Sequence, residues 1–114
     1  MSGVAALAAP PQPFTVETFN QLAHSGKPIV VDVAASWCTT CMAQKNIIDR
    51  LARQAAYREV AVLVVDFDEK DLLRQLKVSV QSTLIAYRGG HEVGRSVGDA
   101  TESGINRIFE KAVN

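Results

Sequence analysis

Two almost uninterrupted apolar runs, separated by an amphipathic stretch, restrict this chain to a small set of folds. The runs are Ile29–Ala34, which holds a single acid at Asp32, and Val60–Val65. Strands that are covered on both faces of a parallel sheet have this composition, because neither row of side chains meets water. Apolar residues at helical spacing between the runs, over Cys38–Ala56, predict a long helix. Strand, helix and strand in this order predict a βαβ unit with parallel strands and a right-handed crossover.

The rest of the chain adds further elements to this unit. We expect a helix over Thr15–His24, with Thr15 as its N-cap and a Ser-Gly-Lys-Pro segment that ends it. A short helix is predicted to begin in the acidic segment Asp66–Asp71, because acidic side chains in a first turn suit the helix dipole. Thr83–Tyr87 and Glu92–Val97 are predicted to form an antiparallel hairpin around two glycines, and a final helix follows. The prediction is one α/β domain with a mixed sheet of about four strands.

Length and charge narrow the classes of function. The chain of 114 residues fits one domain, and its 12 basic and 12 acidic residues balance to a net charge of zero. This balance implies neither a basic patch for nucleic acid nor an acidic tail. No apolar run approaches the roughly 18 residues that a membrane-spanning helix needs. We therefore expect a globular domain with no nucleic-acid partner and no membrane span.

The first residues have a composition of their own. Gly3–Ala9 is apolar and rich in alanine, and Pro10, Pro11 and Pro13 follow it. We interpret residues 1–13 either as the trimmed remnant of a secretory signal, although the basic region of such a signal is missing, or as a disordered tail. Prolines favour extended, unpaired backbone. The folded domain is therefore predicted to span residues 14–114.

The chain has two cysteines, Cys38 and Cys41, which lie between the first buried strand and the long helix. Two cysteines are too few for a disulfide framework but are the right number for one redox pair. A thiolate at a helix N-terminus meets unpaired amide groups and the positive end of the helix dipole, and both lower its pKa. We therefore expect Cys38 to be the exposed, activated sulfur and Cys41 the sheltered one behind it.

Several motifs of this chain resemble those of the thioredoxin family. They are Val31-Asp32 in the buried strand, Trp37-Cys38-x-x-Cys41 before the long helix, the Thr83-Leu84 strand, the Gly89-Gly90 turn and Gly98 before the last helix. The resemblance extends from Phe14 to the C-terminus. It implies a thioredoxin-like fold with helices on both faces of the mixed sheet. It also implies a monomeric thiol–disulfide oxidoreductase that needs no cofactor.

The resemblance further implies roles for residues at matching positions. Cys38 would attack a substrate disulfide, and Cys41 would resolve the mixed disulfide that results. Asp32 matches the family's buried carboxylate, whose raised pKa suits it to take the proton from Cys41. The alternative for Asp32 is a structural acid whose oxygens are satisfied by backbone or water. Trp37 matches a docking surface beside the sulfur, with a half-buried packing aromatic as the alternative.

Two positions depart from the family's pattern. Thr39-Thr40 stands where most members have Gly-Pro, a dipeptide that tunes the reduction potential, so the direction of redox drive stays open. Ser82 replaces the proline that forms a cis peptide bond ahead of the following strand. A cis bond before a residue other than proline costs about 2.5–4 kcal/mol. We therefore predict a trans Gln81–Ser82 bond and a locally shifted loop.

The loop around this position pairs with extended substrates in the family, which makes Gln81, Ser82 and Thr83 candidate substrate contacts. The Ser82 hydroxyl also stands where it could bond a sulfur, unless Ser82 is an ordinary polar loop residue. A Gln-Ser-Thr segment here resembles exported members of the family. This favours a periplasmic location over a cytoplasmic one.

The favoured function is reduction of protein disulfides by dithiol–disulfide exchange. The expected partners are a disulfide-containing protein substrate and an upstream thiol reductase that supplies electrons. The alternative is a metal-binding or interaction module, in which thiolates of one chain or of a dimer hold a soft metal such as copper(I) or an iron–sulfur cluster. His24 and His91 are expected at the surface, away from the cysteines, so no four-ligand zinc site within one chain is predicted.

Overall fold

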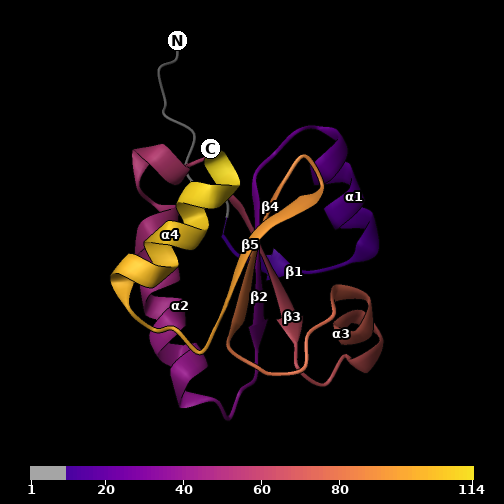
Figure 1. Cartoon of the computed structure of the whole chain (residues 1–114), viewed down its shortest axis with the longest axis vertical. Coiled ribbons are helices and arrows are strands. Elements are labelled where there is room, and N and C mark those ends of the chain that lie inside the picture. The colour runs from indigo at the N-terminus through magenta and orange to yellow at the C-terminus, as the bar shows by residue number, and fades with distance from the viewer. Residues whose placement is uncertain (1–9) are drawn as a thin grey trace.

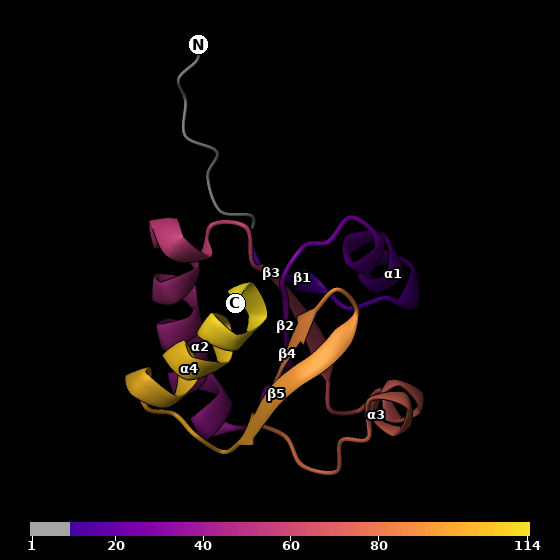
Figure 2. The same ribbon diagram turned by 45° about the horizontal axis from the view of Figure 1, so that its top comes forward.

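The chain folds around a five-stranded mixed sheet with the strand order β1-β3-β2-β4-β5. The structure, a computed structural model, describes residues 10–114. α2 and α4 cover one face of the sheet, and α1 and α3 cover the other (Figures 1 and 2). None of the helices described is both long and apolar enough to cross a membrane. In chain order the elements are β1 (Gln12–Pro13), α1 (Val16–His24), β2 (Ile29–Ala34), α2 (Thr39–Ala52), the 3-10 helix η1 (Ala55–Tyr57), β3 (Ala61–Asp66), α3 (Lys70–Leu76), β4 (Thr83–Arg88), β5 (His91–Val97) and α4 (Glu102–Val113).

The βαβ unit predicted from the two apolar runs is confirmed. β2 and β3 pair in parallel on either side of the α2 crossover, β4 runs antiparallel to β2, and β5 runs antiparallel to β4. β2 lies in the middle of the sheet with five of its six residues buried, which explains its almost continuous apolar sequence. Side chains alternate along it, so Val30 packs in the core with α2 and α4, and Val31 packs in the core on the opposite face. Asp32 therefore shares the α2 face with Val30.

The sheet has one strand more than predicted. Gln12–Pro13 form β1, which lies parallel to β3 at the edge of the sheet, and the Phe14 N–H donates to the Val64 carbonyl over 2.9 Å. The prediction of unpaired backbone is therefore wrong for these two residues. Proline is tolerated at a sheet edge, and a strand of two residues leaves no periodic signal in the sequence. Residues 1–9 of the predicted tail lie outside the described residues.

Two of the helices begin at threonine caps, of which the sequence predicted Thr15. Thr15 Oγ1 accepts the Thr18 N–H at the start of α1, over 3.0 Å. Thr101 Oγ1 accepts the Gly104 N–H at the start of α4, over 3.1 Å. Each bond satisfies an N–H group that has no partner within its helix. Gly26, with a φ of 76°, ends α1 where the Ser-Gly-Lys-Pro segment predicted a stop.

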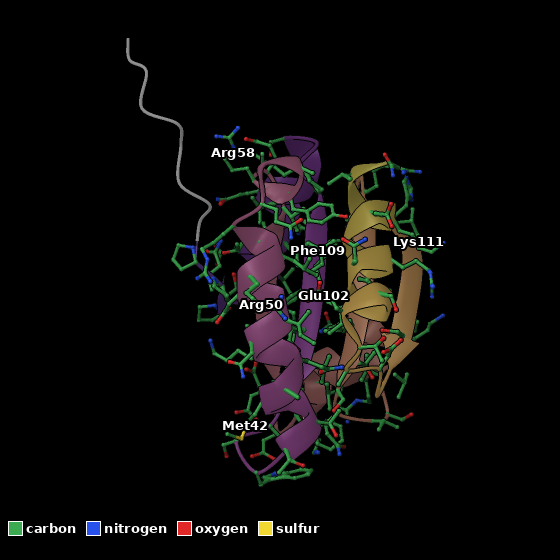
Figure 3. All side chains as sticks on the ribbon, turned by 90° about the vertical axis from the view of Figure 1, so that its left-hand side faces the viewer. Met42, Arg50, Arg58, Glu102, Phe109 and Lys111 are labelled. Atoms are coloured by element: carbon green, nitrogen blue, oxygen red, sulfur yellow. A yellow bond between two sulfur atoms is a disulfide. The ribbon has the colours of Figure 1, made fainter. Side chains whose placement is uncertain are left out.

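The long helix is shorter than predicted and ends at Ala52 instead of Ala56. The chain then turns through η1, because Tyr57 packs inward against the core. The Tyr57 ring lies 5.3 Å from that of Phe109, which Figure 3 labels on α4, and its hydroxyl donates to Asn106 Oδ1 over 2.7 Å. Tertiary packing therefore decides where this helix ends.

α3 begins later than the acidic segment suggested. Asp66 is the last residue of β3, and its Oδ1 accepts the Asp68 N–H over 2.8 Å in a turn that precedes the helix. The helix starts at Lys70 and ends at Leu76, and its C-cap Lys77 has left-handed backbone angles of φ 57° and ψ 48°. The Lys77 carbonyl accepts a hydrogen bond from Arg95 Nη1 over 2.9 Å.

We expect Lys77→Gly to raise the free energy of unfolding by ~1 kcal/mol. Left-handed backbone costs a residue with a Cβ atom about 1–2 kcal/mol, and the greater freedom of glycine in the unfolded chain offsets part of that gain. The Lys77 side chain is exposed, and the bond to Arg95 uses its carbonyl. Urea denaturation should show a higher midpoint with an unchanged slope. Gln75→Gly, inside α3, is the matched control and should lower the midpoint; an equal drop for Lys77→Gly would contradict the prediction.

Candidate active site

Cys38 lies between β2 and α2 and is the N-cap of α2. Its Sγ accepts the backbone N–H of Cys41 over 3.1 Å, and its carbonyl accepts the Met42 N–H over 3.2 Å. The Cys38 N–H donates to the Ala35 carbonyl over 3.1 Å, which fixes the turn that leads into the helix. A thiolate at this Sγ would meet an N–H donor and the positive end of the helix dipole. The sulfur is thus placed at the helix start, as the sequence predicted.

Cys38 and Cys41 form a disulfide, and their Cα atoms lie 5.2 Å apart. Both residues are buried, with exposed fractions of 4% and 5%. The predicted contrast between an exposed Cys38 and a sheltered Cys41 is therefore wrong for the oxidised form. Both cysteines belong to a small apolar cluster with Ala35, against which Phe67 packs.

A cavity of about 310 Å³ reaches the Cys41 side of the disulfide. Asp32 of β2 and Lys45 and Asp49 of α2 contribute to its lining, together with Met42. Met42 is exposed at the beginning of α2, where Figure 3 labels it. Asp32 and Cys41 therefore border one cavity on the α2 face of the sheet.

Asp32 is a buried carboxyl group, 6% exposed, and its Oδ1 has no hydrogen-bond partner among residues 10–114. Burial raises the pKa of Asp32 from 3.8 to about 6, while the charge of Lys45 lowers it and that of Asp49 raises it by smaller amounts. Lys45 forms an ion pair with Asp49 over 2.8 Å, so its positive charge is shared between two carboxylates. A carboxyl with this pKa is ionised at neutral pH and is a stronger base than an exposed aspartate.

The loop before β4 turns a serine hydroxyl onto the disulfide. No peptide bond in residues 10–114 is cis, so the Gln81–Ser82 bond is trans, as predicted. Ser82 has a φ of 66°; its N–H donates to the Val33 carbonyl over 2.9 Å, and its carbonyl accepts the Gly98 N–H over 3.0 Å. The Ser82 Oγ lies 3.2 Å from each of the two sulfur atoms. This loop therefore places a polar side chain against the disulfide.

Gln44 is a site residue that was not predicted from the sequence. Its side chain is fully buried, and Nε2 donates to the carbonyls of Ser82, over 3.1 Å, and of Asp99, over 3.0 Å. The amide thereby ties the loop before β4 to the loop before α4. A signal was present, because Gln44 falls at helical spacing between Cys41 and Ile48, on the inward face of α2.

The other candidate substrate contacts differ in accessibility. Trp37 is 64% exposed, and its ring makes a T-shaped contact with that of Phe67 at a centroid distance of 6.5 Å. Gln81 is half-buried beside Val80, which is exposed. Thr83 is buried, and its hydroxyl donates to the Val80 carbonyl over 2.6 Å. Trp37 is thus open to a partner, whereas the Thr83 side chain serves the loop itself.

The two histidines lie in exposed positions. His24, at the end of α1, has its Nδ1 2.7 Å from the Asn20 carbonyl, and His91 begins β5. Within the described part of the chain, no three His, Cys, Asp or Glu side chains gather as metal ligands would.

Comparisons with known proteins point to one family. The family model named Thioredoxin matches residues 11–111. Among curated proteins, Thioredoxin-2 of Saccharomyces cerevisiae is 41% identical over 80 residues, which cover 69% of this chain and 75% of the yeast protein. Thioredoxin H2-1 of Oryza sativa is 34% identical over 96 residues, covering 81% of this chain and 68% of the rice protein.

Solved structures agree with this result. The crystal structure of Trxlp from Edwardsiella tarda is 40% identical, with a TM-score of 0.84, and the match covers 88% of this chain and 98% of that one. Thioredoxin NaTrxh from Nicotiana alata is 26% identical with a TM-score of 0.79, and the match covers 98% of this chain and 100% of that one. The sheet order and the two helical layers described above are thus shared with solved thioredoxins.

Proposed function

Because the chain belongs to the thioredoxin family, it is a thiol–disulfide oxidoreductase, and we propose that it reduces protein disulfides with Cys38 as nucleophile and Cys41 as resolving thiol. One observation carries the assignment of roles: Cys38 is the sulfur that caps α2, and the Cys41 N–H points at it. The capping position favours the anion at Cys38, so this sulfur is the better attacking group. The thioredoxin names of the relatives support reduction as the direction.

The first step transfers the substrate onto Cys38. The Cys38 thiolate attacks one sulfur of the substrate disulfide, so that a bond between Cys38 and this sulfur forms while the substrate's own S–S bond breaks. The second substrate sulfur leaves as a thiolate and takes up a proton from solvent. The product is a mixed disulfide between substrate and Cys38.

The second step closes the disulfide seen in the structure. The Cys41 thiol gives its proton to Asp32, which borders the same cavity, and the resulting thiolate attacks Cys38 Sγ. The Cys38–Cys41 bond forms, the mixed disulfide breaks, and the remaining substrate sulfur leaves as a thiolate that is protonated. Two electrons have then passed from the dithiol to the substrate.

A new cycle needs a donor of two electrons and two protons. We propose a thioredoxin reductase as this donor. One relative in Mycobacterium leprae is named a bifunctional thioredoxin reductase/thioredoxin, and 28% identity over 96 residues links 83% of this chain to 21% of that protein. The name places a reductase and a thioredoxin in one polypeptide there, which supports a reductase as the partner class here.

Turnover of insulin disulfides in the presence of dithiothreitol tests the proposed function. Catalytic amounts of the protein should shorten the time before reduced insulin precipitates, relative to dithiothreitol alone. The same protein with both thiols alkylated after reduction is the matched control and should have no effect. Equal rates for the native and alkylated proteins, on insulin and on a second disulfide protein, would refute the reductase proposal.

Trp37→Ala is expected to raise the KM for a protein disulfide substrate about fivefold to tenfold, because an exposed aromatic ring beside the reacting sulfur provides apolar contact to a docked chain. The ring is 64% exposed, so removing it leaves the core intact. Exchange with glutathione, which is too small to use this contact, should keep its rate. Steady-state kinetics on both substrates measures the difference. A parallel loss on both would show that Trp37 acts on the sulfur chemistry instead.

The exported location stays a proposal that rests on the sequence. Its support is the alanine-rich segment Gly3–Ala9 and the Gln-Ser-Thr segment before β4. The first of these lies outside the described residues. Fractionation of the source cells tests it directly.

A further inference from the structure

We propose that Ser82 is a catalytic residue whose hydroxyl donates a hydrogen bond to the Cys38 thiolate in the reduced protein. The bond would increase the thiolate fraction of Cys38 and make the dithiol a weaker reductant than the same site without the hydroxyl. The inference rests on the proposed function, since it concerns the same cysteine pair. Of the readings that the sequence left open for Ser82, it favours a bond to sulfur over a substrate contact, and it adds a role in setting the reduction potential.

The direction of the hydrogen bond follows from the oxidation state. Ser82 Oγ lies 3.2 Å from both sulfurs, and neither sulfur carries a proton in the disulfide. The hydroxyl is therefore the donor. It has one proton to give and already stands between the two sulfurs.

Reduction leaves the two sulfurs with different charges. Cys38, which accepts an N–H at the helix start, carries the negative charge, and Cys41 keeps its proton until it reacts. Hydrogen bonds to an ionised acceptor are roughly twice as strong as those between neutral groups. The Ser82 proton should therefore turn to Cys38, and no movement of the backbone is needed.

The loop holds Ser82 in a conformation that serves this contact. A φ of 66° is unusual for a residue with a Cβ atom and is favourable for glycine. Both backbone polar groups of Ser82 are bonded, its N–H to Val33 and its carbonyl to Gly98 and to the buried Gln44 amide. A strained backbone conformation that several hydrogen bonds hold in place beside a reactive group is typical of a functional position.

Gln44 is then a positioning residue that acts through Ser82. Its amide reaches the Ser82 carbonyl from the inward face of α2, and α2 also carries Cys41. The same amide donates to the Asp99 carbonyl, so it also connects the loop before α4 to the loop that holds Ser82. Loss of this amide would let the Ser82 side chain move away from the sulfurs.

The test compares Ser82→Gly with the wild-type protein. Glycine removes the hydroxyl and fits the positive φ, so the variant should fold at least as well. The pH dependence of alkylation by iodoacetamide gives the pKa of Cys38, and redox equilibrium with glutathione gives the reduction potential. We expect the pKa to rise by about one unit. At a pH above the Cys38 pKa of both the wild type and the variant, we also expect a tenfold shift of the glutathione equilibrium. This shift corresponds to about 30 mV and makes the variant the stronger reductant.

Two further variants separate the hydroxyl from general disturbance. Ser36→Ala removes an exposed hydroxyl two residues before Cys38 and should leave the pKa and the potential unchanged. Gln44→Met should raise the Cys38 pKa by less than Ser82→Gly does. The double variant Ser82→Gly/Gln44→Met should match Ser82→Gly alone, because Gln44 acts on Cys38 only through the serine.

The possible results distinguish this inference from the proposed function. If Ser82→Gly raises the Cys38 pKa and Ser36→Ala does not, the role of Ser82 is supported. If wild type exchanges with glutathione but Ser82→Gly has an unchanged or lower pKa, the inference on Ser82 fails and the reductase proposal stands. If wild type forms no disulfide with glutathione at all, both are overturned.

Discussion

Replacing Cys38 with serine is expected to reduce the turnover of insulin disulfides to the rate of dithiothreitol alone. A serine hydroxyl is not ionised at neutral pH and cannot form the mixed disulfide on which the cycle depends. Cys41 cannot take over, because it lies within the first turn of α2, whereas Cys38 is the residue that caps the helix. The loss should be complete in the insulin assay, while the fold, measured by circular dichroism, should be kept.

Cys41→Ser is the matched control for this loss. It lacks the resolving thiol but should leave the first attack intact, so that without dithiothreitol one substrate sulfur remains bound to Cys38 per protein molecule. A Cys38→Ser protein that still turns over insulin at a substantial part of the wild-type rate would show that Cys41 can act as the nucleophile.

Asp32→Asn is expected to slow resolution of the mixed disulfide about a hundredfold at pH 7, at the low end of the effects that general bases have. The asparagine has nearly the same shape but cannot accept the proton of Cys41. In wild type the rate should rise as pH passes through about 6, where Asp32 becomes ionised. In the variant the rise should occur only as the Cys41 thiol itself ionises. Stopped-flow measurement of the resolution step against pH makes the comparison.

The same substitution should also change stability with a defined pH dependence. The folded protein holds the Asp32 proton up to about pH 6, whereas an ordinary aspartate loses it near 3.8. Between these values the folded state binds more protons than the unfolded state, so the free energy of unfolding falls as pH rises. Above pH 6 the ionised carboxylate costs the fold up to ~3 kcal/mol. Asp32→Asn should therefore be more stable than wild type at pH 8, with a difference that shrinks towards pH 4.

Urea denaturation of the oxidised proteins at pH 4, 6 and 8 measures this difference. Asp49→Asn, on the rim of the same cavity, is the control, because the charge of Asp49 is a smaller cause of the raised pKa than burial is. Equal pH profiles for wild type and Asp32→Asn would mean that Asp32 ionises in the fold as it does in the unfolded chain. The proposed base for Cys41 would then have to be found elsewhere.

The central part of the fold could be predicted because its signals are local. β2 was found at its observed bounds, since a strand buried on both faces has to be apolar throughout. The Thr15 cap and a glycine stop located the start and the end of α1. The end of α2 could not be found this way, because Tyr57 and Phe109 determine it from distant parts of the chain.

The site divides in the same manner. The sequence placed Cys38 at the helix start and predicted the trans bond before Ser82, because both follow from motif position and bond energetics. It could not show that Gln44 holds the loop, nor that both cysteines are buried, since these depend on how α2, β2 and the loop before β4 pack together. The composition and net charge of the chain do not specify these tertiary contacts.

The most direct test is to trap the covalent intermediate. Incubating the Cys41→Ser protein with a disulfide-bonded peptide should give one peptide per chain, attached through Cys38 when the digest is mapped by mass spectrometry. The Cys38→Ser protein under the same conditions should remain largely unmodified, because its remaining thiol lacks the capping position. Equal labelling of the two proteins, or attachment at Cys41 alone, would contradict the assignment of Cys38 as the attacking sulfur.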